Sequence, residues 1–316
     1  MGLGHIISAY IDEPIKDVNI IQGGHINHTF LVTCAEQYIL QRMNSTLYGD
    51  CLEDIEHNYL QYVRACDELR DDVGQWECPE WLRTKDGEFF YRDHMGEYWR
   101  MYRYIPSDGF AKDASDDDYI AVGAGLGKLH RILELCDEIR PIKSTEHIHD
   151  LSFHYRKYEE QAGSKMPRIE EFDRLIDLNI EHLLDIHVPT SYVIHGDAKI
   201  TNMIFRNGEV VGFVDLDTIM KGSIFDDLAD CIRSCCLDED GKFDFMKVSQ
   251  IQRGYEIGYD ADFTRDAVEL LGKNLVRNRF TLGIRYYTDY LAGTDCFADL
   301  TPEQKLERVC DLMRIS

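Results

Sequence analysis

The stretch that decides the fold is His195-Gly196-Asp197-Ala198-Lys199-Ile200-Thr201-Asn202, which is followed by Asp215-Leu216-Asp217. Short runs of β-branched and aromatic residues between turn residues predict buried strands. Three such runs surround these polar residues, at 192–194, 203–205 and 210–214. The polar residues therefore lie at strand ends, where loops on a rigid support present functional side chains.

The spacing of the polar residues in this stretch predicts phosphoryl transfer. Asn202 lies five residues after Asp197, and Asp215 lies thirteen residues after Asn202. Protein kinases use an aspartate, an asparagine and a second aspartate in this order, the first as base and the others as Mg²⁺ ligands. We therefore expect Asp197 to be catalytic and Asn202, Asp215 and Asp217 to bind the metal. We expect Lys199 to neutralise charge on the transferred phosphoryl group.

The composition predicts an ordinary globular protein of the cytoplasm. The 316 residues are 44% hydrophobic and 29% charged, as in most soluble domains. No run of about 18 apolar residues occurs, and the first residues do not resemble a signal peptide. The ten cysteines include no Cys-x-x-Cys pair, which favours buried thiols in a reducing compartment.

The formal net charge of −24 indicates which classes of molecule the protein can bind. A chain this acidic repels nucleic acid and anionic membranes, so we expect neither as a partner. ATP is an anion too, so its phosphates must be neutralised locally by Mg²⁺ and by Lys or Arg side chains. An acidic protein would also suit a cationic acceptor such as an aminoglycoside, although a solvated acidic surface is the simpler interpretation.

The N-terminal residues predict a β-hairpin that would cover the nucleotide. Residues 18–33 read as two apolar strands around a turn that contains Gly23 and Gly24. Glycine lets backbone N–H groups approach phosphate closely, as in the phosphate-binding loops of kinases. We therefore expect Gly23, Gly24, His25 and Asn27 to contribute to the nucleotide site.

Two further strands would complete a small nucleotide-binding lobe. In the strand 38–43, Gln41 stands where kinases carry a phosphate-binding lysine. Gln41 and Arg42 point to opposite faces of the strand, so only one of them can face the phosphates. The strand 98–105 leads into the hinge, where we expect adenine to bind the backbone of three residues, Arg103, Tyr104 and Ile105.

The chain beyond the hinge predicts a helical lobe, which places the domain boundary between 1–105 and 106–316. Ser115 and Asp118 have the spacing of a capping box at the start of a helix. Apolar periodicity predicts further helices at 168–186, 242–259, 263–280 and 303–314. In the small lobe it predicts a helix at 52–69, and Trp81 to Phe90 reads as a hairpin.

Four stretches outside the central motif carry a family resemblance. They are Gly24-His25-Ile26-Asn27, Leu40-Gln41-Arg42-Met43-Asn44, Tyr98-Trp99-Arg100-Met101-Tyr102 and Gly283-Ile284-Arg285-Tyr286-Tyr287-Thr288-Asp289-Tyr290-Leu291. Together with the His195–Asn202 core, they resemble the N-acetylhexosamine 1-kinase group of the aminoglycoside phosphotransferase and choline kinase superfamily. The resemblance covers residues 18–297.

This resemblance implies an α+β, protein-kinase-like fold with a small antiparallel β lobe and a mainly helical large lobe. It implies ATP- and Mg²⁺-dependent phosphorylation of the anomeric hydroxyl of a hexosamine. It also implies that Gln41 is compatible with activity and that Arg285 binds sugar, and we expect Asp289 and Asp197 to contact the sugar too. In the alternative interpretation, Arg285 and Asp289 lie four residues apart on a helix and merely pair with each other.

Two other functions remain open at this point. The first is a kinase for an amino alcohol or an aminoglycoside, because 18 tyrosines could build an aromatic cage for a quaternary amine. The second is a non-catalytic nucleotide-binding module, which the missing strand lysine would favour. The presence of Asp197, Asn202 and Asp215 argues against this second alternative.

Overall fold

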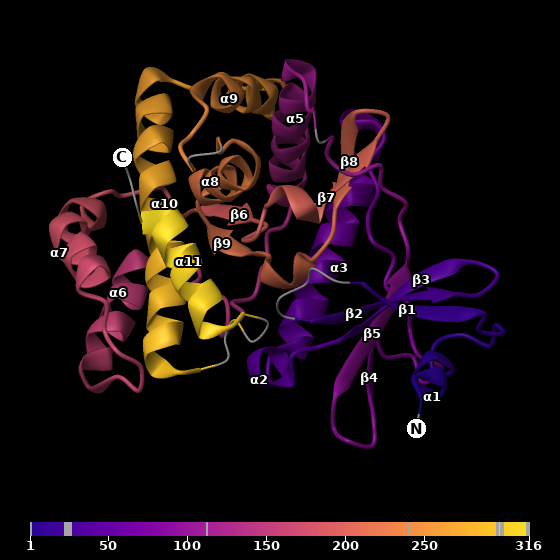
Figure 1. The fold of residues 1–316 in the computed structure, drawn as a ribbon. Helices are drawn as coiled ribbons and strands as arrows, with labels where there is room; N and C mark the ends of the chain where they lie inside the picture. The colour runs from indigo at the N-terminus through magenta and orange to yellow at the C-terminus, as the bar shows by residue number, and fades with distance from the viewer. Residues whose placement is uncertain are drawn as a thin grey trace.

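A small antiparallel sheet and a larger helical region lie side by side in the computed structural model (Figure 1). The structure describes residues 2–21, 27–111, 113–238, 241–294, 297 and 300–313. Its two-lobed, kinase-like α+β arrangement confirms the predicted fold class.

The small lobe is built on a five-stranded sheet with the order β1-β2-β3-β5-β4. Every neighbouring pair is antiparallel. The strands are β1 (Asp17–Ile21), β2 (His28–Thr33), β3 (Gln37–Arg42), β4 (Phe90–Arg92) and β5 (Tyr98–Arg103). The helices of this lobe are α1 (Gly4–Ile7), α2 (Ser45–Tyr48), α3 (Leu52–Glu68) and α4 (Arg70–Val73). The helix predicted at 52–69 is therefore confirmed.

The two faces of this sheet have different surroundings because side chains alternate along each strand. Leu40 and Met101 pack with Ile7 of α1 in an apolar cluster on one face. Gln41 and Arg100 are adjacent to these residues along their strands and lie on the other face, where Arg100 donates hydrogen bonds to Gln41 and to Asp217 of the large lobe. The α1 face is therefore structural, and the second face is turned toward the catalytic residues.

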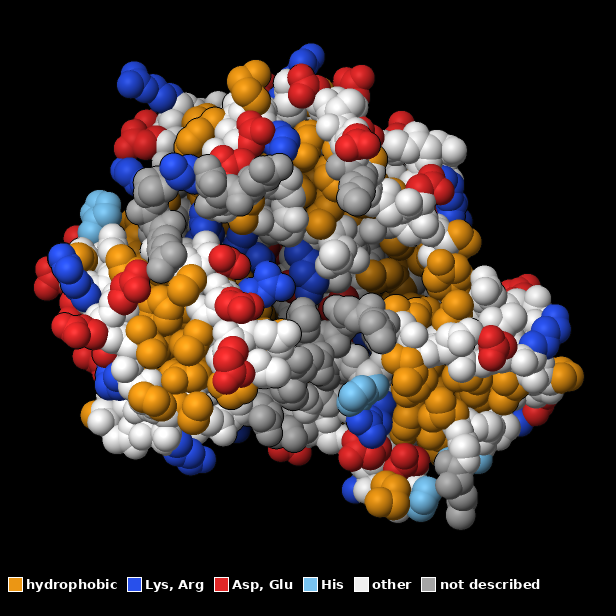
Figure 2. All heavy atoms as spheres, viewed as in Figure 1, with side chains coloured by type: hydrophobic (Ala, Val, Ile, Leu, Met, Phe, Trp, Pro, Cys, Tyr) orange, Lys and Arg blue, Asp and Glu red, His pale blue; other side chains and the backbone are white. Residues whose placement is uncertain are grey.

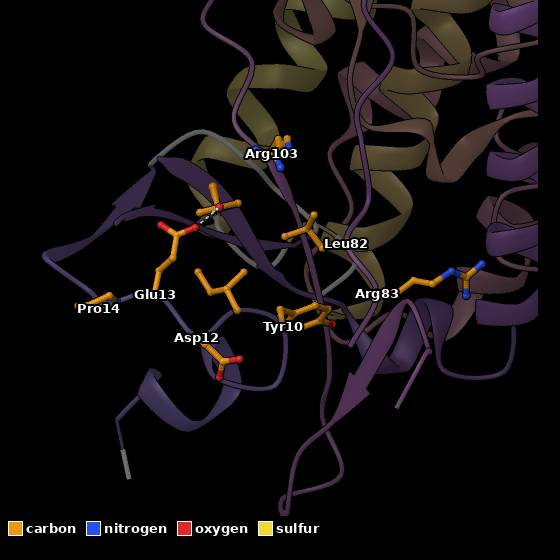
Figure 3. Close-up of a pocket in the computed structure, with 9 residues that line it drawn as sticks. Tyr10, Asp12, Glu13, Pro14, Leu82, Arg83 and Arg103 are labelled. Atoms are coloured by element: carbon orange, nitrogen blue, oxygen red, sulfur yellow. Dashed lines mark hydrogen bonds between the residues drawn. The ribbon is translucent and has the colours of Figure 1, made fainter. Parts of the chain in front are cut away.

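A groove of about 600 Å³ opens on the α1 face of the sheet (Figure 3). Glu13 lies in its wall and accepts a 2.8 Å hydrogen bond from the hydroxyl of Tyr38, which lies on the same side of β3 as Leu40. Arg103 also lines the groove, and it lies on the same side of β5 as Met101. The groove is thus separated from the catalytic residues by the sheet itself.

The large lobe consists mainly of helices. They are α5 (Asp116–Leu133), α6 (Leu151–Glu159), α7 (Glu170–Leu184), α8 (Ile224–Cys235), α9 (Phe245–Tyr259), α10 (Arg265–Ala292) and α11 (Pro302–Met313). The long helix α10 contacts α6, α8 and α11 (Figure 1). Ser115 caps α5 in the predicted capping box with Asp118. In the part of the chain that is described, no helix is both long and apolar enough to cross a membrane.

Helices α5 and α9 approach closely because glycines lie at their contact. A Cβ atom added to Gly123 would lie 2.0 Å from the carbonyl oxygen of Ile251, and one added to Gly254 would lie 2.0 Å from that of Ile120. Any larger residue would push the helices apart.

Two short strand pairs lie between the helices and the sheet, and they frame the central motif. Strand β6 (Tyr192–Ile194) pairs with β9 (Met220–Gly222), and β7 (Met203–Arg206) pairs with β8 (Glu209–Phe213). Three short 3₁₀ helices complete the described part of the chain: η1 (Glu160–Gly163), η2 (Ile200–Asn202) and η3 (Leu216–Thr218). The three strands predicted around the motif are therefore confirmed.

Two local predictions need correction. Only the turn of the predicted hairpin at 81–90 is formed: the Thr84 N–H donates to the carbonyl of Glu88, but Trp81 bridges to Tyr102 and β4 begins only at Phe90. The Trp81 ring instead stacks on Tyr59 of α3, with 3.9 Å between the ring centroids. The helix predicted to end at residue 280 continues to Ala292, because the first left-handed C-cap glycine is Gly293.

Candidate active site

The loop that carries Asp197 is anchored by a buried carboxylate on α8. The backbone N–H groups of His195 and Gly196 donate to Asp227, at 2.7 and 2.9 Å. His130 of α5 lies 3.0 Å from the same carboxylate. Burial favours the neutral acid, but the hydrogen bond and charge of His130 outweigh it and hold the pKa of Asp227 below its usual value.

The backbone at Gly196 requires glycine. Its φ angle is +82°, and an added Cβ atom would lie 2.5 Å from the carbonyl oxygen of Thr218. The Thr218 hydroxyl in turn donates a 2.7 Å hydrogen bond to the carbonyl oxygen of His195. The loop between β6 and β7 is therefore fixed from both sides.

Asp197 projects from this loop toward Lys199 and Asn202. The Nζ atom of Lys199 lies 2.5 Å from Oδ2 of Asp197, and Nδ2 of Asn202 lies 3.1 Å from the same oxygen. Burial alone would raise the pKa of Asp197, but the charge and hydrogen bond of Lys199 lower it below the usual value. Asp197 is therefore an ionised carboxylate that can accept a proton.

Asp215 has a strained backbone, and the pKa of its carboxyl group is raised. Its φ and ψ angles of 64° and 52° lie in the left-handed region, which Asp and Asn tolerate better than most residues. Burial, followed by the negative charges of Asp217 and Asp197, raises the pKa of Asp215 to about 6. Strain of this kind is typical of functional positions.

The two segments that carry the predicted metal ligands Asn202 and Asp215 are joined by a backbone hydrogen bond. The N–H group of Val214 donates a 2.8 Å hydrogen bond to the carbonyl of Asn202, which ties the segment before Asp215 to the Asn202 loop. Carboxylate and amide oxygens are ligands that Mg²⁺ prefers, and Mg²⁺ commonly takes others from phosphates and water. No cluster of three His, Cys, Asp or Glu residues suited to a metal occurs in the described ranges. Asn202 and Asp215 offer oxygens of this kind, and metal binding by them stays a prediction.

Asp217 is occupied by a buried ion pair with the small lobe. Both of its oxygens accept hydrogen bonds from the Arg100 guanidinium, one of them 2.9 Å from Nη2. Nδ2 of Asn27 lies 3.2 Å from the same carboxylate. Oε1 of Gln41 accepts two bonds from Arg100, at 2.9 and 2.7 Å. Gln41, rather than Arg42, is thus the residue of β3 that faces the catalytic side, while metal binding by Asp217 stays a prediction.

The other residues predicted to bind nucleotide fall into two groups. Gly23, Gly24 and His25 lie outside the described residues. At the hinge, the N–H groups of Arg103 and Tyr104 already donate to the carbonyls of Glu80 and Gln37. No bond of the Ile105 N–H group occurs within the described part of the chain. Adenine binding at the hinge stays a prediction, and Ile105 is the residue of the three whose N–H has no partner among the described residues.

A second charged group lies beside Asp197, on the side of the helical lobe. Arg233 and Asp230 of α8 form a 3.0 Å ion pair. Nε2 of His149 lies 3.0 Å from the carbonyl oxygen of Gly196 and 3.9 Å from Asp230. The buried Nε atom of Arg233 has no hydrogen-bond partner among the described residues. This side of the site thus has a hydrogen-bond donor that no described residue uses.

Arg285 of α10 reaches the same region without an ion pair of its own. Burial lowers the pKa of Arg285, and the nearby charges of Asp230 and Asp197 oppose that shift. Its guanidinium lies over the ring of Phe297, 5.7 Å from the centroid. Throughout the described ranges, no carboxylate lies within ion-pair distance of Arg285. Figure 2 shows Lys and Arg side chains gathered in a hollow between the lobes.

Asp289 has partners other than Arg285. It lies 2.7 Å from Nζ of Lys305 on α11 and accepts a 2.5 Å hydrogen bond from the Thr294 hydroxyl. It also accepts the N–H of Phe297 at 3.3 Å. The simple helical pairing of Arg285 with Asp289 is therefore not formed. A contact between Asp289 and a sugar stays a prediction, and the carboxylate also ties the segment after α10 to α11.

Three residues of the site were missed by sequence reasoning. Arg100 and Asp227 are charged residues at positions that are otherwise apolar, which is a usable signal. Tyr48 of α2 is 2% exposed, and burial with the charges of Asp217 and Asp215 raises its pKa well above the usual value. No local pattern distinguishes Tyr48 from a core tyrosine.

Comparison with known families agrees with this geometry. The model of the APH family, described as the phosphotransferase enzyme family, matches residues 17–268. The chain belongs to this family. It is a phosphotransferase that acts on small molecules, and the family match confirms that part of the predicted function.

Solved structures of similar fold cover nearly the whole chain. An amicoumacin kinase bound to AMP-PNP and Ca²⁺ superposes with a TM-score of 0.68 at 12% identity, covering 99% of this chain and 91% of its own. A microcompartment-associated aminopropanol kinase gives 0.66 at 14% identity, with 98% and 92% covered. Aminoglycoside 2'-phosphotransferase-IIIa with GDP gives 0.65 at 14% identity, with 99% of both chains covered. At these identities the likeness establishes the fold.

Proposed function

We propose that this phosphotransferase uses ATP and Mg²⁺ to phosphorylate the anomeric hydroxyl of a hexosamine, N-acetylglucosamine or N-acetylgalactosamine. The observation that carries the proposal is that the charge of Arg285 interacts with those of Asp230 and Asp197, while no carboxylate lies within ion-pair distance of it among the described residues. A guanidinium fork in this position can donate hydrogen bonds to sugar hydroxyls.

The chemistry follows from the loop geometry. The sugar hydroxyl oxygen forms a bond to the γ-phosphorus while the bond from that phosphorus to the bridging oxygen of ADP breaks. Asp197 accepts the hydroxyl proton, since Lys199 keeps its carboxylate ionised. Lys199 also places a positive charge beside the transferred group.

The nucleotide and the metal are assigned to the groups between the lobes. Asn202 and Asp215 hold Mg²⁺, with Asp217 as a further predicted ligand, and the ion supplies charge neutralisation of the phosphates. The N–H of Ile105 binds the adenine edge, while Arg103 and Tyr104 shape the hinge. Phosphate binding by Gly23, Gly24 and His25 stays a prediction from the sequence.

The charge on the acceptor side favours a neutral acceptor over a cationic one. Arg233 and Arg285 both contribute positive charge there, and the Asp230 carboxylate is already paired with Arg233. A protonated amine would meet this positive charge, whereas a neutral sugar can accept hydrogen bonds from both guanidinium groups. The pocket also rejects an acceptor that lacks one of the bonded hydroxyls, because its own donors would be left unpaired.

An amino alcohol or aminoglycoside kinase is the second candidate. Two of the solved structures of similar fold are an aminopropanol kinase and an aminoglycoside phosphotransferase. In such an enzyme, Asp197 and Asp230 would both have to attract the substrate amine. The pairing of Asp230 with Arg233 makes this the less favoured candidate.

A thermal-shift screen with Mg²⁺ and an inert ATP analogue separates the two candidates. We expect N-acetylhexosamines to raise the melting temperature further in the presence of an inert ATP analogue, and choline, ethanolamine and kanamycin to have no such effect. Stabilisation by the amines alone would favour the second candidate. Stabilisation by nucleotide but by neither class would point to another acceptor.

A further inference from the structure

Arg100 is an unusually buried charge for a residue outside the predicted motif. Its side chain is 1% exposed, and so is that of its partner Asp217. The guanidinium also lies over the ring of Trp81, 4.4 Å from the centroid. Removing two charges from water costs several kcal/mol per ion, so a pair this buried is poor evidence for stability alone. Another role would explain why the pair is present.

The position of Arg100 in the sheet suggests that role. In the β3–β5 register, Arg100 lies directly opposite Gln41. Gln41 is at the place where kinases carry the phosphate-binding lysine. The amide oxygen of Gln41 accepts two hydrogen bonds from Arg100. A positive charge is thus present at this point of the sheet, but it comes from the neighbouring strand.

The partner of this positive charge also differs from the usual kinase arrangement, in which the strand lysine pairs with a glutamate of the helix after it. Gln41 additionally donates to the Thr29 hydroxyl at 3.2 Å. Among the described residues, the hydrogen bonds of Gln41 and Arg100 involve no carboxylate of α3. Arg100 instead reaches across to Asp217, two residues after the predicted metal ligand Asp215.

We propose that Arg100 replaces the missing strand lysine and acts as a positioning residue for the metal–nucleotide site. By holding both oxygens of Asp217, it fixes the short η3 segment that begins at Leu216 and thereby the strained Asp215 before it. This inference rests on the proposed metal role of Asp215, but it does not depend on which acceptor is phosphorylated. Partners that orient metal ligands typically contribute about 10–100-fold to metal affinity.

The first test removes the guanidinium and measures binding of ATP by calorimetry, with and without Mg²⁺ and without acceptor. Arg100→Met is expected to lower the Mg²⁺-dependent part of the affinity about tenfold or more. Arg92→Met, on the exposed part of β4, is the matched control and should bind as the wild type does. If Arg100→Met keeps the full Mg²⁺ enhancement, the positioning role is wrong.

The second test asks whether a lysine on β3 can take over. In the Arg100→Met background, Gln41→Lys places an ammonium beside Asp217 and should restore most of the Mg²⁺-dependent affinity. In the wild-type background, the same substitution sets two cations together in a buried place and should weaken binding. A merely structural pair predicts no such reversal of sign. Failure of Gln41→Lys to improve the Arg100→Met protein would overturn the proposal.

A third variant covers the case in which Arg100→Met does not fold, since an unpaired buried Asp217 is strongly destabilising. Arg100→Lys keeps the charge but loses the two-point contact with the carboxylate. It should fold and lose about fivefold or more in Mg²⁺-dependent affinity, and wild-type affinity would contradict the proposal. Absence of Mg²⁺-dependent ATP binding by the wild-type protein would instead contradict the proposed function itself.

Discussion

Two arginines approach the catalytic carboxylates from different lobes, and they differ in what they contact. Arg100 of the small lobe is fully buried, and its donors are taken up by Asp217 and Gln41. Arg285 of the helical lobe is partly buried and has no ion pair among the described residues. A donor that is already satisfied can position other groups, whereas an unsatisfied one is available to a ligand. This difference supports the two proposals that Arg100 positions other groups of the protein and that Arg285 binds the acceptor.

The largest expected effect concerns the carboxylate between these two arginines. Asp197→Asn should lower the turnover number by about 10²–10⁴-fold, because general-base catalysis contributes this much. Folding and MgATP binding should be spared, since the amide has nearly the same shape. Steady-state kinetics, melting temperature and calorimetry together check this expectation.

The control for this substitution is Asp177→Asn, on the exposed face of α7. It should leave the turnover number unchanged. An Asp197→Asn protein with half of the wild-type rate would show that Asp197 is not the base. The positions of Arg100 and Arg285 relative to Asp197 would then say nothing about their roles in catalysis.

Arg285→Ala tests the acceptor side of the comparison. Hydrogen bonds to a charged group contribute about 1.5–3 kcal/mol, so the KM for the sugar should rise about 10–100-fold. The KM for ATP should change much less, because Arg285 lies on the helical-lobe side of Asp197. Arg265→Ala, at the exposed start of the same helix, is the control. Equal increases in the KM for the sugar and the KM for ATP would contradict the proposal that Arg285 binds the acceptor.

Asp215→Asn should have a smaller effect, on the free energy of unfolding, and the size of this effect should depend on pH. The folded pKa of Asp215 is raised to about 6, so the native state binds a proton more tightly than the unfolded chain does. Stability is therefore lost as pH rises from about 4 to about 6, and it stays reduced above that range. Without metal, Asp215→Asn should be more stable than the wild type at pH 8 by roughly 1–3 kcal/mol.

This advantage should shrink as the pH is lowered, and thermal unfolding across pH 4–8 in the presence of a chelator measures it. The same substitution should abolish the extra stabilisation that Mg²⁺ gives in the presence of ATP. An advantage that is independent of pH would contradict the raised pKa. A retained Mg²⁺ effect would contradict the metal role.

The sequence predicted those features that depend on neighbouring residues. The strands around Asp197 and the capping box of Ser115 both follow from local spacing. Alternation along β3 showed that only Gln41 or Arg42 could face the nucleotide, but it could not tell which. That choice depends on which face of the sheet α1 covers, and this is a property of the folded chain.

The residue pairs that complete the site could not be predicted from the sequence, because they join segments that are distant along the chain. Arg100 and Asp217 are 117 residues apart, and His195 and Asp227 are 32 residues apart. Charge patterns within one helix or strand carry no information about such pairs. The same limit explains Asp289, for which helical spacing suggested Arg285, whereas the fold supplies Lys305.

The identity of the product tests the central claim most directly. The protein is incubated with MgATP and N-acetylglucosamine or N-acetylgalactosamine, and the product is examined by phosphorus NMR, by acid hydrolysis and by an assay for reducing ends. Phosphorylation at C1 predicts an acid-labile product without a reducing end. A product that keeps its reducing end and resists acid would carry its phosphate on another hydroxyl. That result, or phosphate on choline or kanamycin and on no sugar, would contradict the proposed function.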